Sequence, residues 1–245
     1  CIWSFRLGCS LNIKNITIKR DDKILCKNLS LHVSHKEKVA IIGPNGCGKT
    51  TFLETIVGFC PLNGGEIELF HQNIASKNDF KTVRHMVGYL LQDSDNQFLA
   101  PIVEDDVAFT LLAHGADKNE ARVKTDMILN DLGISHLAKK VVYHLSGGEK
   151  KLVALAGVLI SEPKLMLLDE PTAGLDFSMQ LKLTQILKKI DKSIIIVSHD
   201  DEFVESVVDK IYKISPNGLK RMANSKTEYV HSHDGLPPHT HPHEH

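Results

Sequence analysis

The residues with the strongest chemical signal form a glycine-rich segment after a short apolar run at 39–42. They match the phosphate-binding pattern G-x-x-x-x-G-K-[ST] at every fixed position, as Gly43, Pro44, Asn45, Gly46, Cys47, Gly48, Lys49 and Thr50, with Thr51 next. Glycines let successive backbone N–H groups point into one concavity that holds phosphates. The lysine ammonium can reach the terminal phosphates, and the first threonine hydroxyl can bind Mg²⁺. The pattern predicts a site for ATP and Mg²⁺.

A second pattern places two carboxylates at the end of an apolar run. Residues 165–168 are apolar and lead directly into Asp169 and Glu170. Ligands bind at the carboxyl ends of strands in open α/β sheets. We therefore expect Asp169 to hold Mg²⁺ and Glu170 to act as general base on the attacking water. Many strands end in acids, so this pattern gains its weight from the phosphate-binding segment.

A third segment, at 145–149, joins a serine to two glycines at the start of a predicted helix. Ser146, Gly147 and Gly148, with the helix N-terminus, can form a second anion site. For these five residues alone, an ordinary capped helix is the alternative interpretation. One phosphate-binding segment suffices to bind ATP, so a second anion site suggests that two subunits meet head to tail, each ATP lying between them.

The elements that must position these residues alternate along the chain. Strands are expected at 11–18, 39–42, 87–91, 165–168 and 194–197. Helices are expected from about residue 49 and at 104–114, 120–132 and 148–160. Alternating strands and helices predict an α/β fold with a mainly parallel sheet. The helices between about 93 and 160 interrupt the alternation and predict an inserted helical subdomain.

The order of the motifs resembles that of ABC transporter nucleotide-binding subunits over roughly residues 11–215. The resemblance implies a P-loop NTPase cassette with an N-terminal antiparallel β portion. It also implies that Gln92 is the Q-loop glutamine, which contacts Mg²⁺ or water and senses a membrane partner. Asp176 corresponds to the D-loop that couples two ATP sites, and His199 to the switch histidine on the γ-phosphate.

A narrower resemblance points to one branch of that family. Segments 92–98, 103–109 and 154–159 are similar to the energy-coupling-factor importers. This similarity implies a transmembrane coupling protein, a substrate-specific membrane subunit, and a peripheral position on the cytoplasmic face of the cell membrane. The cargo of that branch is a vitamin or a transition-metal ion.

The chain departs from the family pattern at the adenine-binding position. ABC cassettes usually stack adenine on an aromatic residue near the end of the first strand, where this chain has Lys19 and Arg20. A guanidinium is flat and can stack on a base. Arg20 is therefore the candidate for adenine binding.

The composition changes near residue 225, so we expect a cassette at 11–224 between an N-terminal extension (1–10) and a tail (225–245). Neutral imidazoles bind Ni²⁺ and Co²⁺ well, so these ions are the expected tail ligands. Together with the resemblance to energy-coupling-factor importers, the tail makes nickel or cobalt the expected cargo. The alternative interpretation of this segment is a solubilising tail without a metal role, or a remnant of cloning. The tail histidines are His231, His233, His239, His241, His243 and His245.

Bulk composition limits the partners of the 245-residue chain. Its net charge of −1 gives no global basic field of the kind that nucleic-acid binders show. The apolar runs are strand-sized, so transport would need membrane partner chains. One chain carries every motif, which predicts a homodimer, with a related ATPase subunit as the alternative. A non-transport ABC ATPase and a metal-storage protein are the competing functions.

Overall fold

The structure, a computed structural model, describes residues 8–222. Within that range, ten strands form two sheets with seven α-helices around them. The strands are β1 (Cys9–Arg20), β2 (Lys23–Ser34), β3 (Lys38–Ile42), β4 (Glu66–Leu69), β5 (Gln72–Ile74), β6 (Val87–Leu90), β7 (Leu165–Asp169), β8 (Ser193–Val197), β9 (Lys210–Ser215) and β10 (Gly218–Arg221). The helices are α1 (Lys49–Ile56), α2 (Lys77–Val83), α3 (Val103–Ala113), α4 (Lys118–Asp131), α5 (Gly147–Leu159), α6 (Phe177–Lys189) and α7 (Asp201–Val207).

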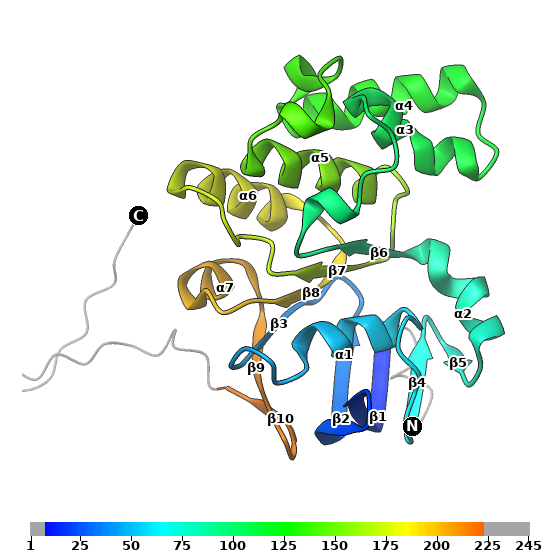
Figure 1. Cartoon of the computed structure of the whole chain (residues 1–245). Coiled ribbons are helices and arrows are strands. Elements are labelled where there is room, and N and C mark those ends of the chain that lie inside the picture. The colour runs from blue at the N-terminus through cyan, green and yellow to red at the C-terminus, as the bar shows by residue number, and fades with distance from the viewer. Residues whose placement is uncertain (1–7, 223–245) are drawn as a thin grey trace, which may run out of the picture.

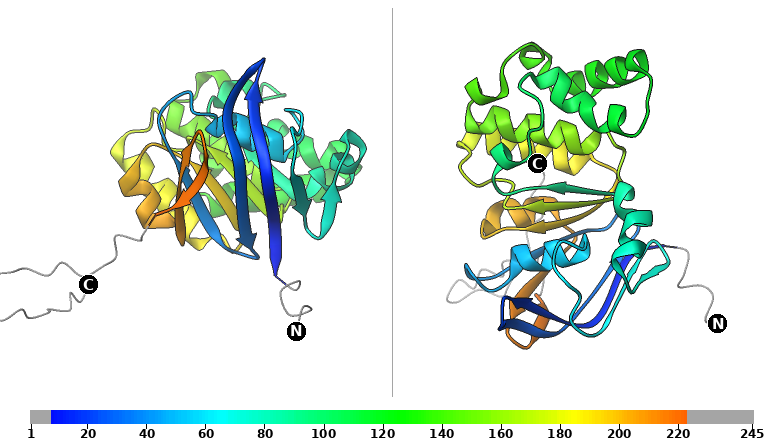
Figure 2. Two further views of the ribbon diagram at one scale, coloured as in Figure 1. Left: turned by 90° about the horizontal axis from the view of Figure 1, so that it is seen from below. Right: turned by 45° about the vertical axis from the view of Figure 1, so that its right-hand side comes forward.

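The larger sheet has the strand order β10-β9-β3-β8-β7-β6, and its strands from β9 to β6 are parallel. The smaller sheet is antiparallel, with the order β2-β1-β4-β5. Helix α1 lies between the two sheets, and α3, α4 and α5 lie on the other side of the larger one (Figures 1 and 2). This arrangement confirms the predicted α/β fold, including its antiparallel N-terminal portion.

The central strands are apolar because both faces of the larger sheet are covered. Every residue of β7 and β8 is buried, as expected for parallel strands between two layers of other elements. On one side, Phe52, Leu53 and Ile56 of α1 join the core that links the two sheets. The carboxyl ends of β3, β7 and β8 therefore meet at one edge of a rigid sheet.

The first strand begins earlier than expected. Strand β1 starts at Cys9, and Ser10 is only 1% exposed, with its Oγ 2.8 Å from that of Ser193 in β8. Strand β1 therefore begins two residues before the strand expected at 11–18. The contact between Ser10 and Ser193 joins the two sheets at this start, and no apolar alternation marks it in the sequence.

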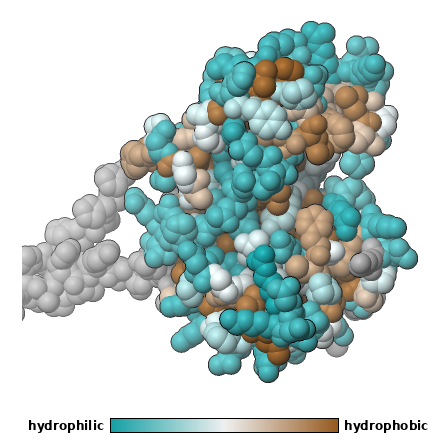
Figure 3. Space-filling model, in the orientation of Figure 1, coloured by the Kyte–Doolittle hydropathy of each residue, from teal (hydrophilic) through white to brown (hydrophobic). Residues whose placement is uncertain are grey.

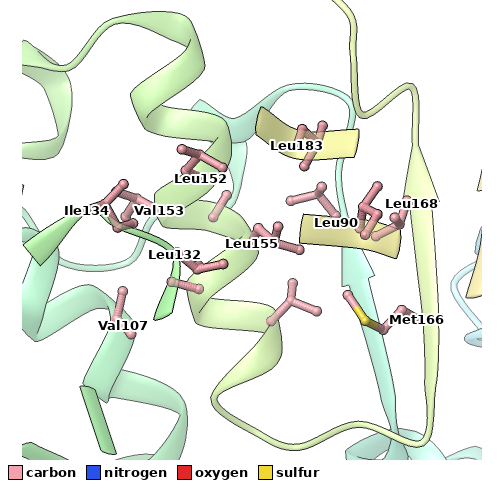
Figure 4. Close-up of a cluster of buried hydrophobic side chains, with 14 of the residues drawn as sticks. Leu90, Val107, Leu132, Ile134, Leu152, Val153, Leu155, Met166, Leu168 and Leu183 are labelled. Atoms are coloured by element: carbon pink, nitrogen blue, oxygen red, sulfur yellow. The ribbon is translucent and has the colours of Figure 1, made fainter. Parts of the chain in front are cut away.

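The helical segment between β6 and β7 confirms the predicted insertion. Helices α3, α4 and α5 begin and end within two residues of the expected positions. Figure 4 shows how α5 fills the core: Leu155 points towards Leu90 of β6, while Val153 points towards Ile134. Helix α5 thus connects the inserted helices to the sheet that carries the predicted site.

The surface of the inserted helices carries apolar side chains. Leu99, Phe109, Leu112 and Met127 are all more than 40% exposed, and Figure 3 shows apolar patches among hydrophilic residues in this region. Among residues 8–222, no helix is both long enough and apolar enough to cross a membrane. The predicted tail of histidines lies outside the described residues.

Candidate active site

The phosphate-binding segment links the end of β3 to the start of α1. Gly48, the last residue before the helix, has a φ of 101°, and a Cβ there would lie 3.2 Å from that of Leu25. Both the left-handed backbone and the close approach of β2 call for glycine. The segment therefore turns tightly and runs directly into the N-terminus of α1, the positive end of the helix dipole.

Lys49 is a buried cation that this segment holds in place. Its side chain is 7% exposed, and its Nζ donates to the carbonyl oxygens of Gly43 and Pro44 at 2.8 and 3.2 Å. A buried ammonium needs such acceptors, because desolvation of an unpaired charge is costly. The loop therefore positions a positive charge beside its own N–H groups, which suits a bound phosphate chain.

The phosphate-binding segment lines one pocket of about 330 Å³, together with residues from Arg20 to His199, which are 179 positions apart. The pocket residues are Arg20, Leu25, Asn45, Gly46, Gly48, Lys49, Thr50, Thr51, Gln92, Asp169, Glu170 and His199. All but Leu25 were predicted from the sequence. Leu25 was missed because only the pairing of β2 with β1 brings it to the loop. No aromatic residue of 8–222 lines the pocket beside Arg20.

Asp169, at the end of β7, provides a carboxylate oxygen without a protein partner. Its Oδ1 is buried and has no hydrogen-bond partner among the described residues, while Oδ2 lies 3.5 Å from the Tyr89 hydroxyl. Burial raises the pKa of the Asp169 carboxyl above its ordinary value, and a hydrogen bond from Thr50 opposes that shift. Tyr89 was not predicted, because its contact depends on the pairing of β6 with β7.

The donor set fits Mg²⁺. An unpartnered buried carboxylate oxygen usually has a ligand or an ion to satisfy it, and Mg²⁺ takes oxygen ligands, including substrate phosphates. Asp169, the Thr50 hydroxyl and the Gln92 side-chain carbonyl supply such oxygens around the same pocket. These three residues would hold the ion, as predicted from the sequence.

Glu170 and His199 form a pair at the pocket wall. The Oε2 of Glu170 lies 2.8 Å from His199 Nδ1 and accepts from the His199 backbone N–H at 3.3 Å. Glu170 is 6% exposed and has a φ of 45°, a strained value for this residue type. Strain of this kind persists where the surrounding structure imposes it. The geometry fixes one carboxylate where it can accept a proton from water in the pocket.

The serine-glycine segment starts α5 away from this pocket. Ser146 caps the helix through a capping box with Glu149. A Cβ on Gly148 would lie 2.5 Å from Cγ of Met179, so this glycine allows α5 to pack closely against α6. Ser146, Gly147 and Gly148 are absent from the lining of the pocket. The structure therefore separates them from the phosphate-binding segment of their own chain.

Asp176 lies on that same separate side. It caps α6, with its Oδ1 accepting from the Met179 N–H at 2.9 Å, and it does not line the pocket. An ideal Cβ on Gly147 would stand 4.0 Å from the carbonyl oxygen of Gly174. The predicted D-loop and the serine-glycine segment are therefore neighbours on a face distinct from the pocket.

Comparisons with known proteins agree with this geometry. The family model described as "ABC transporter" matches residues 26–173. A relative from Brucella suis biovar 1, named as an ABC transporter ATP-binding protein, is 41% identical over 228 residues, which cover 91% of this chain and 95% of the relative. The energy-coupling factor transporter ATP-binding protein EcfA of Methanocaldococcus jannaschii is 38% identical over 219 residues, covering 86% of this chain and 78% of EcfA.

A solved structure is similar over most of the chain. The protein cbiO1 from Clostridium perfringens, described as part of the ABC transporter complex cbiONQ, has a TM-score of 0.81 and 31% identity. The likeness covers 89% of each chain. The family match spans more than half of this sequence. This chain belongs to the ABC transporter family, as an ATP-binding subunit that hydrolyses ATP to drive transport.

Proposed function

We propose that this chain is the motor of an importer of the energy-coupling type, with nickel or cobalt ions as its cargo. One observation carries the motor role: the pocket joins the Lys49 ammonium, the unpartnered oxygen of Asp169 and the Glu170–His199 pair. Similarity to EcfA and to cbiO1 of the cbiONQ complex supports the type of importer. The histidines between 231 and 245 support the choice of metal cargo.

In this proposal, each group in the pocket has a distinct role in hydrolysis. Lys49 and the neighbouring N–H groups bind and orient the phosphates. Glu170 takes a proton from the attacking water, and His199 keeps that carboxylate in place and faces the γ-phosphate. Mg²⁺ held by Asp169, Thr50 and Gln92 would neutralise charge on the phosphate oxygens. Arg20 is assigned to the adenine ring.

The proposed working unit is a homodimer in which each ATP lies between two chains. The support is geometric: Ser146, Gly147, Gly148 and Asp176 lie outside the pocket of their own chain. A serine hydroxyl at a helix N-terminus suits an anion that arrives from elsewhere. A second copy can present its pocket to this face, which completes both sites at once. A related ATPase subunit could take the place of one copy.

The proposed membrane partners are a transmembrane coupling protein and a substrate-specific subunit, with the motor on the cytoplasmic face of the cell membrane. Apolar side chains next to the segment that contains Gln92 support this assignment. Leu99 is 70% exposed, and Phe109 of α3 is 43% exposed. Exposed apolar groups of this kind are typical of interaction sites. A partner that docks there would contact the same region that reaches the pocket through Gln92.

Uptake of radioactive nickel and cobalt tests the proposal in cells that contain the native membrane partners. Cells carry the wild-type gene, the Glu170→Gln variant, or the control Glu202→Gln, which alters an exposed carboxylate outside the pocket. We expect uptake of one ion to be lost only with Glu170→Gln. Uptake of both ions that is unchanged by Glu170→Gln would contradict the metal cargo and direct the same assay to vitamins.

A further inference from the structure

Lys151 is a buried cation that the proposed reaction does not use. It lies on α5, one turn after Gly147, and is 3% exposed. Among the described lysines only Lys49 and Lys151 are buried, and the phosphate-binding segment accounts for Lys49. A lysine at such a position must have acceptors to offset desolvation of its ammonium. Its acceptors therefore indicate what it does.

Both acceptors of Lys151 belong to the segment that carries Gln92. The Nζ of Lys151 donates to the carbonyl oxygen of Gln92 at 2.7 Å and to that of Leu91 at 3.3 Å. These carbonyls follow directly after β6. The carboxylates of Asp93 and Asp169 are the charged groups nearby. The ammonium thus holds the backbone at the residue whose side chain enters the ATP pocket.

Two further side chains fasten the same segment to the same helix. Gln97 accepts from the Leu91 N–H at 3.1 Å and donates to the Ala154 carbonyl of α5 at 3.3 Å. Lys150, with its side chain 18% exposed, pairs with Asp95 at 2.7 Å. Residues 91–97 are therefore tied to α5 by three side chains, two from the helix and one from the segment itself.

Helix α5 also begins with the serine-glycine segment, which does not line the pocket. The contacts therefore join Gln92, in the pocket of this chain, to the helix that Ser146 caps. In the proposed homodimer these two residues belong to different ATP sites. We propose that Lys151 is a positioning residue, which fixes Gln92 in the ATP pocket relative to the α5 N-terminus. Movement of α5 then moves Gln92, and movement of the Gln92 segment moves the helix. This inference rests on the proposed role of Gln92.

The test is a double-mutant cycle between Lys151 and Gln92 in the purified full-length chain. Lys151→Met keeps most of the side-chain volume but removes the donor. We expect it to lower kcat for ATP about tenfold, while the Kd for ATP stays within about twofold. In the Gln92→Ala background, Lys151→Met should cause no further loss, because its effect passes through Gln92. Lys188→Met, on an exposed part of α6, is the matched control.

Two more variants separate positioning from folding. Lys151→Arg keeps a cationic donor, so it should restore kcat to within about threefold of wild type. Gln97→Ala loosens the same segment without leaving a buried charge, and it should also lower kcat only when Gln92 is present. If Lys151→Met fails to fold, the double-mutant cycle is measured with Gln97→Ala and Gln92→Ala instead.

The outcomes distinguish failure of the positioning role of Lys151 from failure of the proposed role of Gln92. Equal loss of kcat in both backgrounds would overturn the inference, since a purely structural lysine would act independently of Gln92. Unchanged kcat in Lys151→Met and Gln97→Ala, with Gln92→Ala impaired, would also overturn it. Normal kcat in Gln92→Ala itself would instead contradict the proposed role of Gln92, and with it the positioning through that residue.

Discussion

Glu170 combines burial, a strained backbone and contact with His199 at one position of the pocket. Replacing it with Gln preserves its size and removes the proton acceptor. We expect kcat for ATP to fall about 10²- to 10⁴-fold, the range that general bases supply. Binding should persist, because the phosphates are held by Lys49. Steady-state hydrolysis and equilibrium ATP binding measure the two effects, and parallel loss of both would refute the assignment as base.

Arg20 offers the pocket a flat cation where the family usually has an aromatic ring. If it stacks on adenine, Arg20→Ala should weaken ATP binding by about two- to fivefold, as expected for an exposed cation–π contact. The control Arg20→Lys keeps the charge but not the planar group. Equilibrium binding should show the same loss in both variants. Wild-type affinity in Arg20→Lys would mean that charge alone matters at this position.

At the residue scale, the order of motifs along the chain predicted which side chains meet in the pocket. Each motif follows the end of a strand or belongs to the glycine-rich segment. The order of motifs did not predict Tyr89 or Lys151. Tyr89 reaches Asp169 through the pairing of β6 with β7, and Lys151 is buried only once α5 packs beside residue 92. A lysine in a predicted helix looks solvent-exposed until that packing is known.

At the scale of elements, the contact between α5 and α6 depends on one of two adjacent glycines. A Cβ on Gly148 would meet Met179 at 2.5 Å, whereas one on Gly147 has only a contact at 4.0 Å. Gly148→Ala should therefore lower the free energy of unfolding by about 1–3 kcal/mol, as overpacking does. Gly147→Ala is the matched control and should change it by less than about 0.5 kcal/mol. Urea unfolding measures both, and equal effects would contradict the packing.

Glu37, in the turn between β2 and β3, links β2 to β9 through its carboxylate. It pairs with Lys210 of β9 and accepts from the Ser34 N–H of β2 at 2.9 Å. Burial raises the pKa of Glu37, but the hydrogen bonds from Lys210 and Ser34 outweigh it, so the pKa lies below its ordinary value. Its contribution to stability is therefore present above the unfolded-state pKa of about 4.3 and is lost as the pH falls through the lower folded-state pKa.

The corresponding variant is Glu37→Gln. It should be less stable than wild type by about 1 kcal/mol at pH 7, and the difference should shrink as the pH falls below about 4. Thermal unfolding between pH 3 and 7 measures it, with Glu202→Gln as control. A difference that stays constant over this range would show that the Glu37 charge does not stabilise the sheet.

The expected bounds of α3, α4 and α5 lie within two residues of those in the structure. Ser146 with Glu149 marks the start of α5 by a capping box, whereas α6, which Asp176 caps, was not among the expected helices. The start of β1 was predicted less well, since Cys9 and Ser10 join the sheet through pairing and a contact with Ser193. Periodicity detects apolar burial, and polar contacts between sheets leave no such trace.

For the whole molecule, the central proposal is that each chain carries two complementary parts of an ATP site on different faces. Lys49 and Glu170 line the pocket, while Ser146 and Asp176 lie on another face. The sequence supplied both sets of residues, and their separation became visible only in three dimensions. If a second copy completes the pocket, two different inactive chains should repair one another.

Mixing the inactive variants Lys49→Ala and Ser146→Arg is the most direct measurement of this claim. Each variant alone should hydrolyse ATP at background rate. In a mixed dimer, the intact pocket of one chain meets the intact α5 N-terminus of the other, so an equimolar mixture should recover up to about a quarter of wild-type activity. If the mixture stays inactive although the two chains form mixed dimers, or if Ser146→Arg alone is fully active, the shared site is contradicted.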